Sequence, residues 1–252
     1  MMTLNAAADA LHARAQGGEV NFLAVTTDTR TLQRGALFVA LRGTRFDGHD
    51  FVKQALDNGA AAAMVDTAAS TASLGVSPDA PLLIVDDTLQ ALGQLASHWR
   101  RGFEVPLIAV TGSNGKTTVK EMLAAILRAE AGSDSAVLAT TGNLNNNIGM
   151  PLTLLQLRQP HRYAVIEMGM NHLGEIDYLT RLAQPTIALV NNAHAAHVGE
   201  LGSLDNIARA KGEIFAGLGK SGIAVLNADD NYAPFWRDLN KDREVIDFGL
   251  HA

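Results

Sequence analysis

Apolar and polar positions alternate along this chain in two styles, and the change falls near Gly102. In the first part the elements expected are a helix at 4–16, strands at 37–41 and 82–85, and helices at 51–58 and 88–101. Residues 66–80 are rich in Ala, Ser and Thr, with one Gly and one Pro, which is loop composition. Gly102 suits a helix stop. The pattern therefore predicts a first, small α/β domain over residues 1–103.

Residues 104–252 alternate strand and helix more regularly, and we assign them to a second domain. The expected strands are four short apolar runs, at 107–111, 163–167, 187–190 and 223–226. Helical spacing lies between them, at 117–130, 174–182 and 204–218. Strands separated by helices favour βαβ crossovers, so we predict an α/β fold with a mostly parallel sheet covered on both faces.

A Gly-rich segment joins the strand expected at 107–111 to the helix that follows. It reads Thr111-Gly112-Ser113-Asn114-Gly115-Lys116-Thr117-Thr118. Backbone N–H groups of such a loop, with the helix N-terminus, form a concave anion site. Lys116 suits the β- and γ-phosphates of ATP, and the Thr117 hydroxyl suits Mg²⁺. The general phosphate-loop pattern has one more glycine, and its place is taken here by Val110.

Composition narrows the class of protein without naming a function. The 252 residues are 47% hydrophobic and 18% charged, with net charge -6 and no cysteine. This fits a globular protein and argues against a nucleic-acid partner, which would select clustered Lys and Arg. Disulfides and thiolate metal sites are excluded. The first 18 residues lack a signal peptide's apolar block, and no apolar run approaches the ~20 residues of a membrane helix. We therefore expect a cytoplasmic protein without membrane insertion.

Polar residues follow two of the expected strands in the second domain. Glu167 ends the run at 163–167, and Asn191, Asn192, His194 and His197 follow the run at 187–190. Ligands of open α/β sheets bind where the strands end, so Glu167 suits a Mg²⁺ ligand, although an ordinary strand-end acid suits it equally. A histidine in such a place is more often structural than a ligand.

Two further polar segments have simple structural explanations. Lys211 lies within the helical pattern at 204–218, where a solvated lysine paired with a neighbouring acid would be ordinary. The run Asn227-Ala228-Asp229-Asp230 after the strand at 223–226 suits a turn or a nucleotide contact.

Taken together, these segments resemble the Mur ligases, whose phosphate loop also lacks the first glycine. The runs that carry the resemblance are 111–118, Thr141-Gly-Asn-Leu-Asn-Asn-Asn-Ile-Gly149, Glu167-Met-Gly-Met-Asn-His-Leu-Gly-Glu-Ile176, Ala196-His-Val-Gly199, Gly202-Ser203 and Ala210-Lys-Gly-Glu-Ile214. It extends back through Thr27-Asp-Thr-Arg30, Leu37-Phe-Val-Ala40 and Phe46-Asp-Gly-His49. Several motifs in order are far more specific than one loop.

The resemblance implies roles that the residues alone left open. Thr117 and Glu167 would ligate Mg²⁺ beside the γ-phosphate, and His197 would belong to a second metal site. Lys211 would be carbamylated and would help to hold metal, which requires a partly desolvated, neutral amine. With Lys116, these residues would form the catalytic centre.

The same resemblance implies an ATP-dependent amide-bond ligase of peptidoglycan precursor synthesis. The member with the most similar motifs joins D-alanyl-D-alanine to UDP-N-acetylmuramoyl-tripeptide through an acyl phosphate. The first domain would bind the UDP end, and the expected contacts are Asp28, Arg30, Phe46, Asp47, Gly48 and His49. Contacts expected from the second domain are Thr140, Thr141, Asn143, Asn145 and Asn146. We expect a monomer.

One departure from the family concerns length. Mur ligases have three domains, and neither their adenine-contacting segment nor their C-terminal ligase domain has a counterpart before Ala252. From the sequence we therefore expect a C-terminally truncated chain with an incomplete central domain and little or no ligase activity.

Other functions stay open at this point. The ligase that adds the third amino acid to the same precursor shares the phosphate loop, and folylpolyglutamate synthetase is a more distant alternative. From a different class, the chain would only bind the UDP-muramoyl peptide without turnover. A nucleotide-controlled regulatory switch is the last alternative, and no partner surface indicates it.

Overall fold

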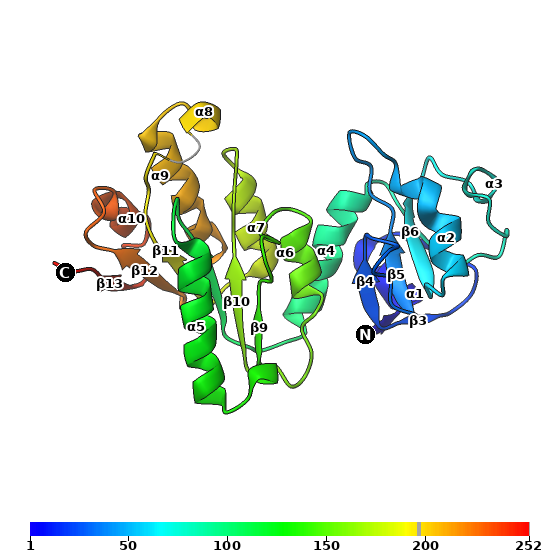
Figure 1. Cartoon of the computed structure of the whole chain (residues 1–252), viewed down its shortest axis with the longest axis horizontal. Coiled ribbons are helices and arrows are strands. Elements are labelled where there is room, and N and C mark those ends of the chain that lie inside the picture. Colours follow the sequence, from blue (N-terminus) through cyan, green and yellow to red (C-terminus); the bar gives the residue numbers. More distant parts are fainter. Residues whose placement is uncertain (196–197, 252) are drawn as a thin grey trace. The chain divides into compact units, whose positions relative to one another are not determined.

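Two separate sheets, one in each half of the chain, organise the structure (Figure 1). The computed structural model describes residues 1–195 and 198–251. Its chain divides into two units, Met1–His98 and Trp99–Ala252. Within the described ranges, every helix is too short or too polar to cross a membrane. Both units mix helices with a largely parallel sheet, so the predicted α/β class is confirmed.

The first unit is built on a five-stranded sheet in the order β2-β7-β6-β5-β4. Its strands are β1 (Met2–Thr3), β2 (Arg14–Gln16), β3 (Asn21–Phe22), β4 (Ala24–Thr26), β5 (Ala36–Val39), β6 (Ala62–Asp66) and β7 (Leu82–Val85). Its helices are α1 (Leu4–Leu11), the 3-10 turn η1 (Gly48–Phe51), α2 (Val52–Asp57), α3 (Thr71–Leu74) and α4 (Thr88–Arg101), which runs on into the second unit. Strands β4 to β7 are parallel, so their carboxyl ends share one edge.

The second unit has a six-stranded parallel sheet in the order β13-β12-β11-β8-β10-β9. Its strands are β8 (Leu107–Thr111), β9 (Val137–Ala139), β10 (Tyr163–Glu167), β11 (Ile187–Val190), β12 (Ile223–Asn227) and β13 (Glu244–Phe248). Its helices are α5 (Lys116–Ala131), η2 (Asp134–Ala136), α6 (Gly149–Leu154), α7 (Glu175–Ala183), α8 (Val198–Leu201), α9 (Leu204–Gly212), η3 (Glu213–Gly217) and α10 (Ala233–Leu239).

The order of these strands marks where a ligand would bind. After β8 the chain builds β9 and β10 on one side and then crosses to build β11, β12 and β13 on the other. Open α/β sheets bind ligands outside the carboxyl ends of the strands at such a reversal. Here that edge is formed by the ends of β8, β10 and β11.

Alternation along β8 explains how this edge is held. Ile108 and Val110 point to the face covered by α5, where they pack with Ala124 and Val165. Leu107 and Ala109 point the other way and are also fully buried. Because both faces are covered, the strand is apolar throughout, as the sequence pattern predicted. Figure 1 shows α5 lying along the sheet, and its first residue, Lys116, belongs to the Gly-rich segment.

Two predicted elements of the first unit were wrong in extent. The helix expected at 4–16 ends at Leu11. His12 takes a left-handed conformation there, and its backbone N–H donates to carbonyls of the last helical turn. Residues 14–16 then pair antiparallel with β7 as β2. The loop expected at 66–80 contains α3, which starts at a capping box between Ser70 and Ser73.

Candidate functional site

The Gly-rich segment forms a tight loop between β8 and α5. Gly115 has φ +75°, a left-handed conformation that favours glycine, and it caps α5 at its N-terminus. At Gly112 a Cβ atom would lie 2.9 Å from the Cβ of Asn191, so close approach requires glycine there. Val110, by contrast, is still within β8 and pairs with Glu167. A glycine is not needed at 110 because the backbone there is an ordinary buried strand.

The end of β11 braces the first half of this loop. The Ser113 N–H donates to the Asn192 carbonyl at 3.0 Å, and the Asn114 N–H donates to Asn192 Oδ1 at 3.0 Å. Asn191 Nδ2 returns a bond to the Asn114 carbonyl at 2.8 Å. His194 meets Ser113 Oγ through its backbone N–H at 2.9 Å, while its side chain is exposed. The polar run after β11 therefore shapes the loop.

Lys116, the first residue of α5, folds its side chain back over the loop. Its ammonium donates to the carbonyls of Gly112 at 2.8 Å and Ser113 at 3.3 Å. Burial lowers the pKa of Lys116, and the negative charge of Glu167 partly opposes that shift. A cation is thus held where an anion on the loop would need it.

Glu167 ends β10 and lies beside the first turn of α5. Its side chain is 1% exposed, and Thr117 Oγ1 donates to its Oε2 at 2.9 Å. Asn145 Nδ2 donates to its Oε1 at 2.7 Å. Both donors are neutral, and the Lys116 ammonium acts on this carboxylate through its charge. A buried carboxylate held only by neutral donors is an environment that a cation would stabilise.

The carboxylate of Glu167 and the hydroxyl of Thr117 fit an Mg²⁺ site that is completed by phosphates and waters. They do not fit a metal site whose ligands all come from protein side chains. No group of three His, Cys, Asp or Glu side chains gathers among the described residues. Mg²⁺ commonly takes one or two carboxylates together with substrate phosphates and waters. A carboxylate and a hydroxyl beside a phosphate loop match this usual set of Mg²⁺ ligands. His197, predicted as a further metal ligand, lies outside the described residues.

Lys211 lies in α9 and is 1% exposed, so a solvated lysine, the simpler of the sequence interpretations, is wrong. Its pKa is lowered to about 7, chiefly by burial and also by the charge of Lys116, while the charge of Glu213 opposes the shift. Glu213 is itself occupied, because it accepts the N–H groups of Gly174 at 2.7 Å and Asp177 at 3.1 Å. Near neutral pH a large share of Lys211 is therefore a neutral amine.

The segment after β9 divides into buried and exposed members. Thr140 is buried, and its Oγ1 accepts the N–H of Glu167 at 2.9 Å. Asn145 is also buried, whereas Thr141, Asn143 and Asn146 are exposed. Sequence reasoning missed Lys120, which is fully buried and donates to the Thr140 carbonyl at 2.8 Å. The burial of this lysine could have been predicted from its position on the apolar face of the helix.

In the first unit the predicted residues lie on two loops at the carboxyl edge of the sheet. Asp28 and Arg30 follow β4 and pair with each other at 2.7 Å, which lowers the pKa of Asp28. Phe46 and Asp47 belong to the loop after β5, and Phe46 is exposed. At Gly48, closing that loop, a Cβ atom would lie 2.6 Å from the Leu41 backbone.

The loop after β5 is fixed by a histidine and an arginine. His49 is buried; its Nδ1 lies 2.6 Å from Asp47 Oδ1, and its Nε2 accepts the Asp66 N–H at 3.1 Å. Since Nε2 accepts, Nδ1 carries the proton and donates to Asp47. Arg42, which sequence reasoning missed, pairs with Asp47 and with Asp66, the latter at 2.7 Å. Its partner Asp66 is 24 positions away, so no local pattern announced it.

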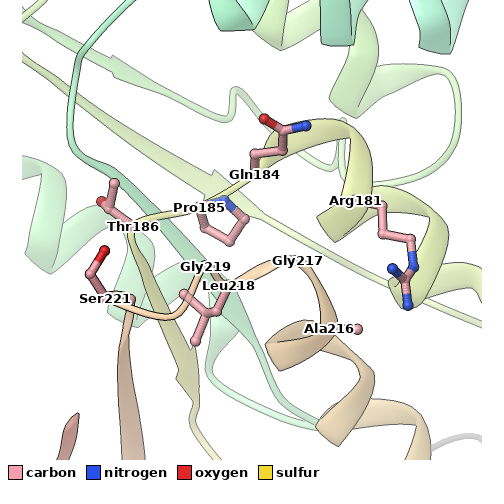
Figure 2. A pocket seen from close by; sticks show the side chains of 10 residues that line it. Arg181, Gln184, Pro185, Thr186, Ala216, Gly217, Leu218, Gly219 and Ser221 are labelled. Atoms are coloured by element: carbon pink, nitrogen blue, oxygen red, sulfur yellow. The ribbon is translucent and has the colours of Figure 1, made fainter. Parts of the chain in front are cut away.

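A hollow of about 540 Å³ lies elsewhere in the second unit (Figure 2). It is lined by Arg181 and Gln184 of the α7 end, by Thr186 before β11 and by Gly222 before β12. These residues stand at the amino ends of the strands, whereas Glu167 stands at a carboxyl end. The hollow therefore belongs to the other edge of the sheet and contains none of the predicted site residues.

Comparison with known proteins adds family relationships to this geometry. The family described as the Mur ligase middle domain matches residues 110–252, and the Mur ligase family catalytic domain matches residues 21–100. The chain is 48% identical over 251 residues to the UDP-N-acetylmuramoyl-tripeptide--D-alanyl-D-alanine ligase of Escherichia coli K12, covering 100% of this chain and 53% of that protein. The chain spans about half the length of the curated relatives it matches.

Solved structures agree with the sequence relatives. A crystal structure of MurF from Acinetobacter baumannii superposes with TM-score 0.87 at 38% identity, covering 98% of this chain and 53% of that one. MurF ligase from Thermotoga maritima, solved in complex with ADP, superposes with TM-score 0.78 at 31% identity, covering 91% and 51%.

Proposed function

The chain belongs to the Mur ligase family, and on that premise we propose that it supplies the ATP phosphate site and the precursor-binding unit of a MurF-type ligase. The reaction proposed is the ATP-dependent joining of D-alanyl-D-alanine to UDP-N-acetylmuramoyl-tripeptide. Identity of 48% to the Escherichia coli ligase over the whole chain supports this choice of substrates.

One observation carries the proposal: the Thr117 hydroxyl and the buried Glu167 carboxylate meet at 2.9 Å beside a phosphate loop. A plain anion site would need the loop alone. An acid placed next to that loop makes sense where a cation accompanies the phosphates. Proposed ligands of Mg²⁺ are therefore Thr117 and Glu167. When bound, Mg²⁺ would offset the repulsion between the γ-phosphate and an incoming carboxylate.

Phosphates would lie against the N–H groups at the start of α5, since Gly115 caps that helix with no side chain in the way. The Lys116 ammonium would leave the carbonyls of Gly112 and Ser113 for the β- and γ-phosphates. The tripeptide's terminal carboxylate would attack the γ-phosphorus, giving an acyl phosphate and ADP. The amine of D-alanyl-D-alanine would then attack the acyl carbon, losing a proton and releasing phosphate.

Lys211 suits the carbamate expected from the family. A neutral amine reacts with CO₂ to give a carbamate and one proton, and the pKa of about 7 supplies that amine near neutral pH. The new carboxylate would lie within the field of the Lys116 ammonium, which would favour it. A metal-binding role for His197 stays a prediction from the sequence.

The first unit is proposed to hold the UDP end of the precursor. Its exposed candidates are Arg30 and Phe46, on loops that leave neighbouring parallel strands at the same edge. Exposed Thr141, Asn143 and Asn146 are proposed as contacts from the second unit.

Phosphate release tests the reaction directly. The chain would be mixed with ATP, Mg²⁺, the UDP-muramoyl tripeptide and D-alanyl-D-alanine, with each substrate omitted in turn. Release that needs all of them supports the proposal. Release with the dipeptide precursor and diaminopimelate or lysine instead would identify the ligase that adds the third amino acid.

Binding can be measured whatever the turnover of this chain. Calorimetric titration with a non-hydrolysable ATP analogue and Mg²⁺, and separately with the UDP precursor, is expected to show both ligands binding. Precursor binding without any nucleotide binding would contradict the proposed phosphate site and would indicate a binding module.

A further inference from the structure

Asn145, predicted as a substrate contact, is buried against the carboxylate that ends β10. It follows β9 in the chain, and β9 pairs with β10, the strand that ends at Glu167. Its side chain is buried, and its Nδ2 donates to Glu167 Oε1 and to Asn143 Oδ1, both at 2.7 Å. With two oxygen atoms as partners, the amide must present nitrogen to Glu167, so its orientation is settled by the network.

The backbone around Asn145 is fixed as firmly as its side chain. The Gly169 N–H donates to the Asn145 carbonyl at 2.9 Å. A Cβ atom at Gly169 would lie 2.9 Å from Asn145 Oδ1, so a glycine is what lets the amide sit against β10. Asn145 therefore reaches Glu167 from a rigid position.

This arrangement divides the two oxygen atoms of the carboxylate. Both oxygens accept a hydrogen bond, Oε1 from the buried Asn145 amide and Oε2 from the Thr117 hydroxyl at the start of α5. A hydroxyl can turn its proton away and bind a cation itself, whereas the amide nitrogen can only donate. A cation beside the phosphate loop would thus meet Oε2, while Oε1 stays bonded to Asn145. Mg²⁺ requires near-octahedral geometry and suits such a ligand, whereas Ca²⁺ takes 6–8 oxygens and readily binds both oxygens of one carboxylate.

We infer that Asn145 is a specificity-determining residue: by engaging Oε1, it keeps Glu167 a one-oxygen ligand and makes the site prefer Mg²⁺ to Ca²⁺. The inference rests on the proposed function, because it concerns the cation that would accompany ATP there. Asn145 acts through Glu167 and touches neither cation nor nucleotide.

Calorimetry with a non-hydrolysable ATP analogue tests this, with Mg²⁺ and Ca²⁺ compared on wild type and on Asn145→Ala. The quantity compared is the ratio of the two affinities. Freeing Oε1 is expected to lower the preference for Mg²⁺ about fivefold or more, mainly through a gain with Ca²⁺. A general loss of structure would weaken both cations alike and leave the ratio unchanged.

Thr153→Val is the matched control. Thr153 is buried in α6, and its Oγ1 donates to the Gly149 carbonyl at 2.9 Å, so the variant also loses one buried hydrogen bond of this segment without contacting Glu167. Its cation ratio should equal that of wild type. An unchanged ratio in Asn145→Ala, with wild type binding normally, overturns the inference alone. Absence of binding in wild type with either cation overturns the proposed function and the inference together.

A crystal structure of the wild-type chain with Mg²⁺ and the same analogue gives a second measurement, which does not depend on the variant folding. Glu167 should contact the cation through one oxygen while Oε1 keeps its bond to Asn145. Two-oxygen binding by Glu167 would overturn the inference.

Discussion

The two units place charged residues at the carboxyl edge of a parallel sheet, but they treat those charges in opposite ways. In the first unit Arg30 and Arg42, both exposed arginines, pair with aspartates, and the side chain of Arg30 is 87% exposed. In the second unit Glu167 and Lys211 are buried, and the opposite charges that act on them, Lys116 and Glu213, are hydrogen-bonded to backbone groups instead. Exposed pairs are nearly satisfied as they stand, whereas buried groups whose charged neighbours are bonded elsewhere gain more from a ligand or a modification.

This difference fits the roles proposed for the two units, precursor binding in the first and chemistry in the second. The second unit has a lowered pKa at Lys116 and Lys211 and a buried carboxylate bonded by neutral donors, the environment in which chemistry is usually located.

Lys211→Met should give the largest effect, on stability and its pH dependence. Below pH 7 the folded chain must bury a charged ammonium, so the full cost is present there. Between about 7 and the ordinary value of 10.5 the unfolded chain binds more protons, and the stability of wild type rises with pH. In CO₂-free buffer the variant should be more stable at pH 6, by on the order of a few kcal/mol, and the gap should close towards pH 10.

Urea unfolding across that pH range measures the difference in stability between the variant and wild type. Lys220→Met, which replaces an exposed lysine, is the control. A pH-independent gap would contradict a depressed pKa at Lys211.

Lys116→Ala should weaken binding of a non-hydrolysable ATP analogue about a hundredfold, because the chain loses the ammonium that lies over the loop. Calorimetry provides the affinity. Lys241→Ala removes an exposed lysine of the same unit and should bind as wild type does. Equal affinity in Lys116→Ala and wild type would remove the loop from the proposed site.

Glu167→Gln tests the buried carboxylate without changing its shape. The gain in analogue affinity on adding Mg²⁺ should fall about tenfold to thirtyfold, while metal-free affinity should not fall. Glu130→Gln, at an exposed position of α5, serves for comparison. A full Mg²⁺ effect in Glu167→Gln would place the cation elsewhere.

His49→Ala probes the first unit and should give the smallest effect. It leaves the Asp66 N–H without its acceptor and frees Asp47, at a cost of about 1 kcal/mol in unfolding free energy. Urea unfolding measures the loss, and binding of the ATP analogue should not change. His251→Ala, at an exposed histidine, is the control. A large loss of nucleotide affinity would contradict the assignment of the nucleotide site to the second unit alone.

Much of the second unit could be predicted from the sequence. The strands at 107–111, 163–167 and 187–190 have the bounds that their apolar runs predicted, because parallel strands covered on both faces are apolar throughout. β6 was missed because Ala62 and Ala63, fully buried beside Phe38, have little strand propensity of their own. β9 was missed because three residues are too few for a periodic signal.

The candidate site was predictable where it follows the chain and unpredictable where it crosses between strands. The loop at 111–118 and the strand-end position of Glu167 are local features. The burial of Lys211 depends on what covers α9, and helical spacing alone cannot give it. Asn145 meets Glu167 only because β9 and β10 are neighbours, and Arg42 meets Asp66 across the first sheet.

The hydrogen bonds between the end of β11 and the phosphate loop also determine which amides of the loop are available to a phosphate. The N–H groups of Ser113 and Asn114 are already bonded to Asn192, so a phosphate would be recognised by the amides that follow Gly115. The loop is therefore ordered before anything binds, and little backbone entropy is lost when a nucleotide arrives. We expect slow hydrogen exchange at those two amides in the ligand-free protein. The exchange rate would measure how often their hydrogen bonds to the end of β11 open.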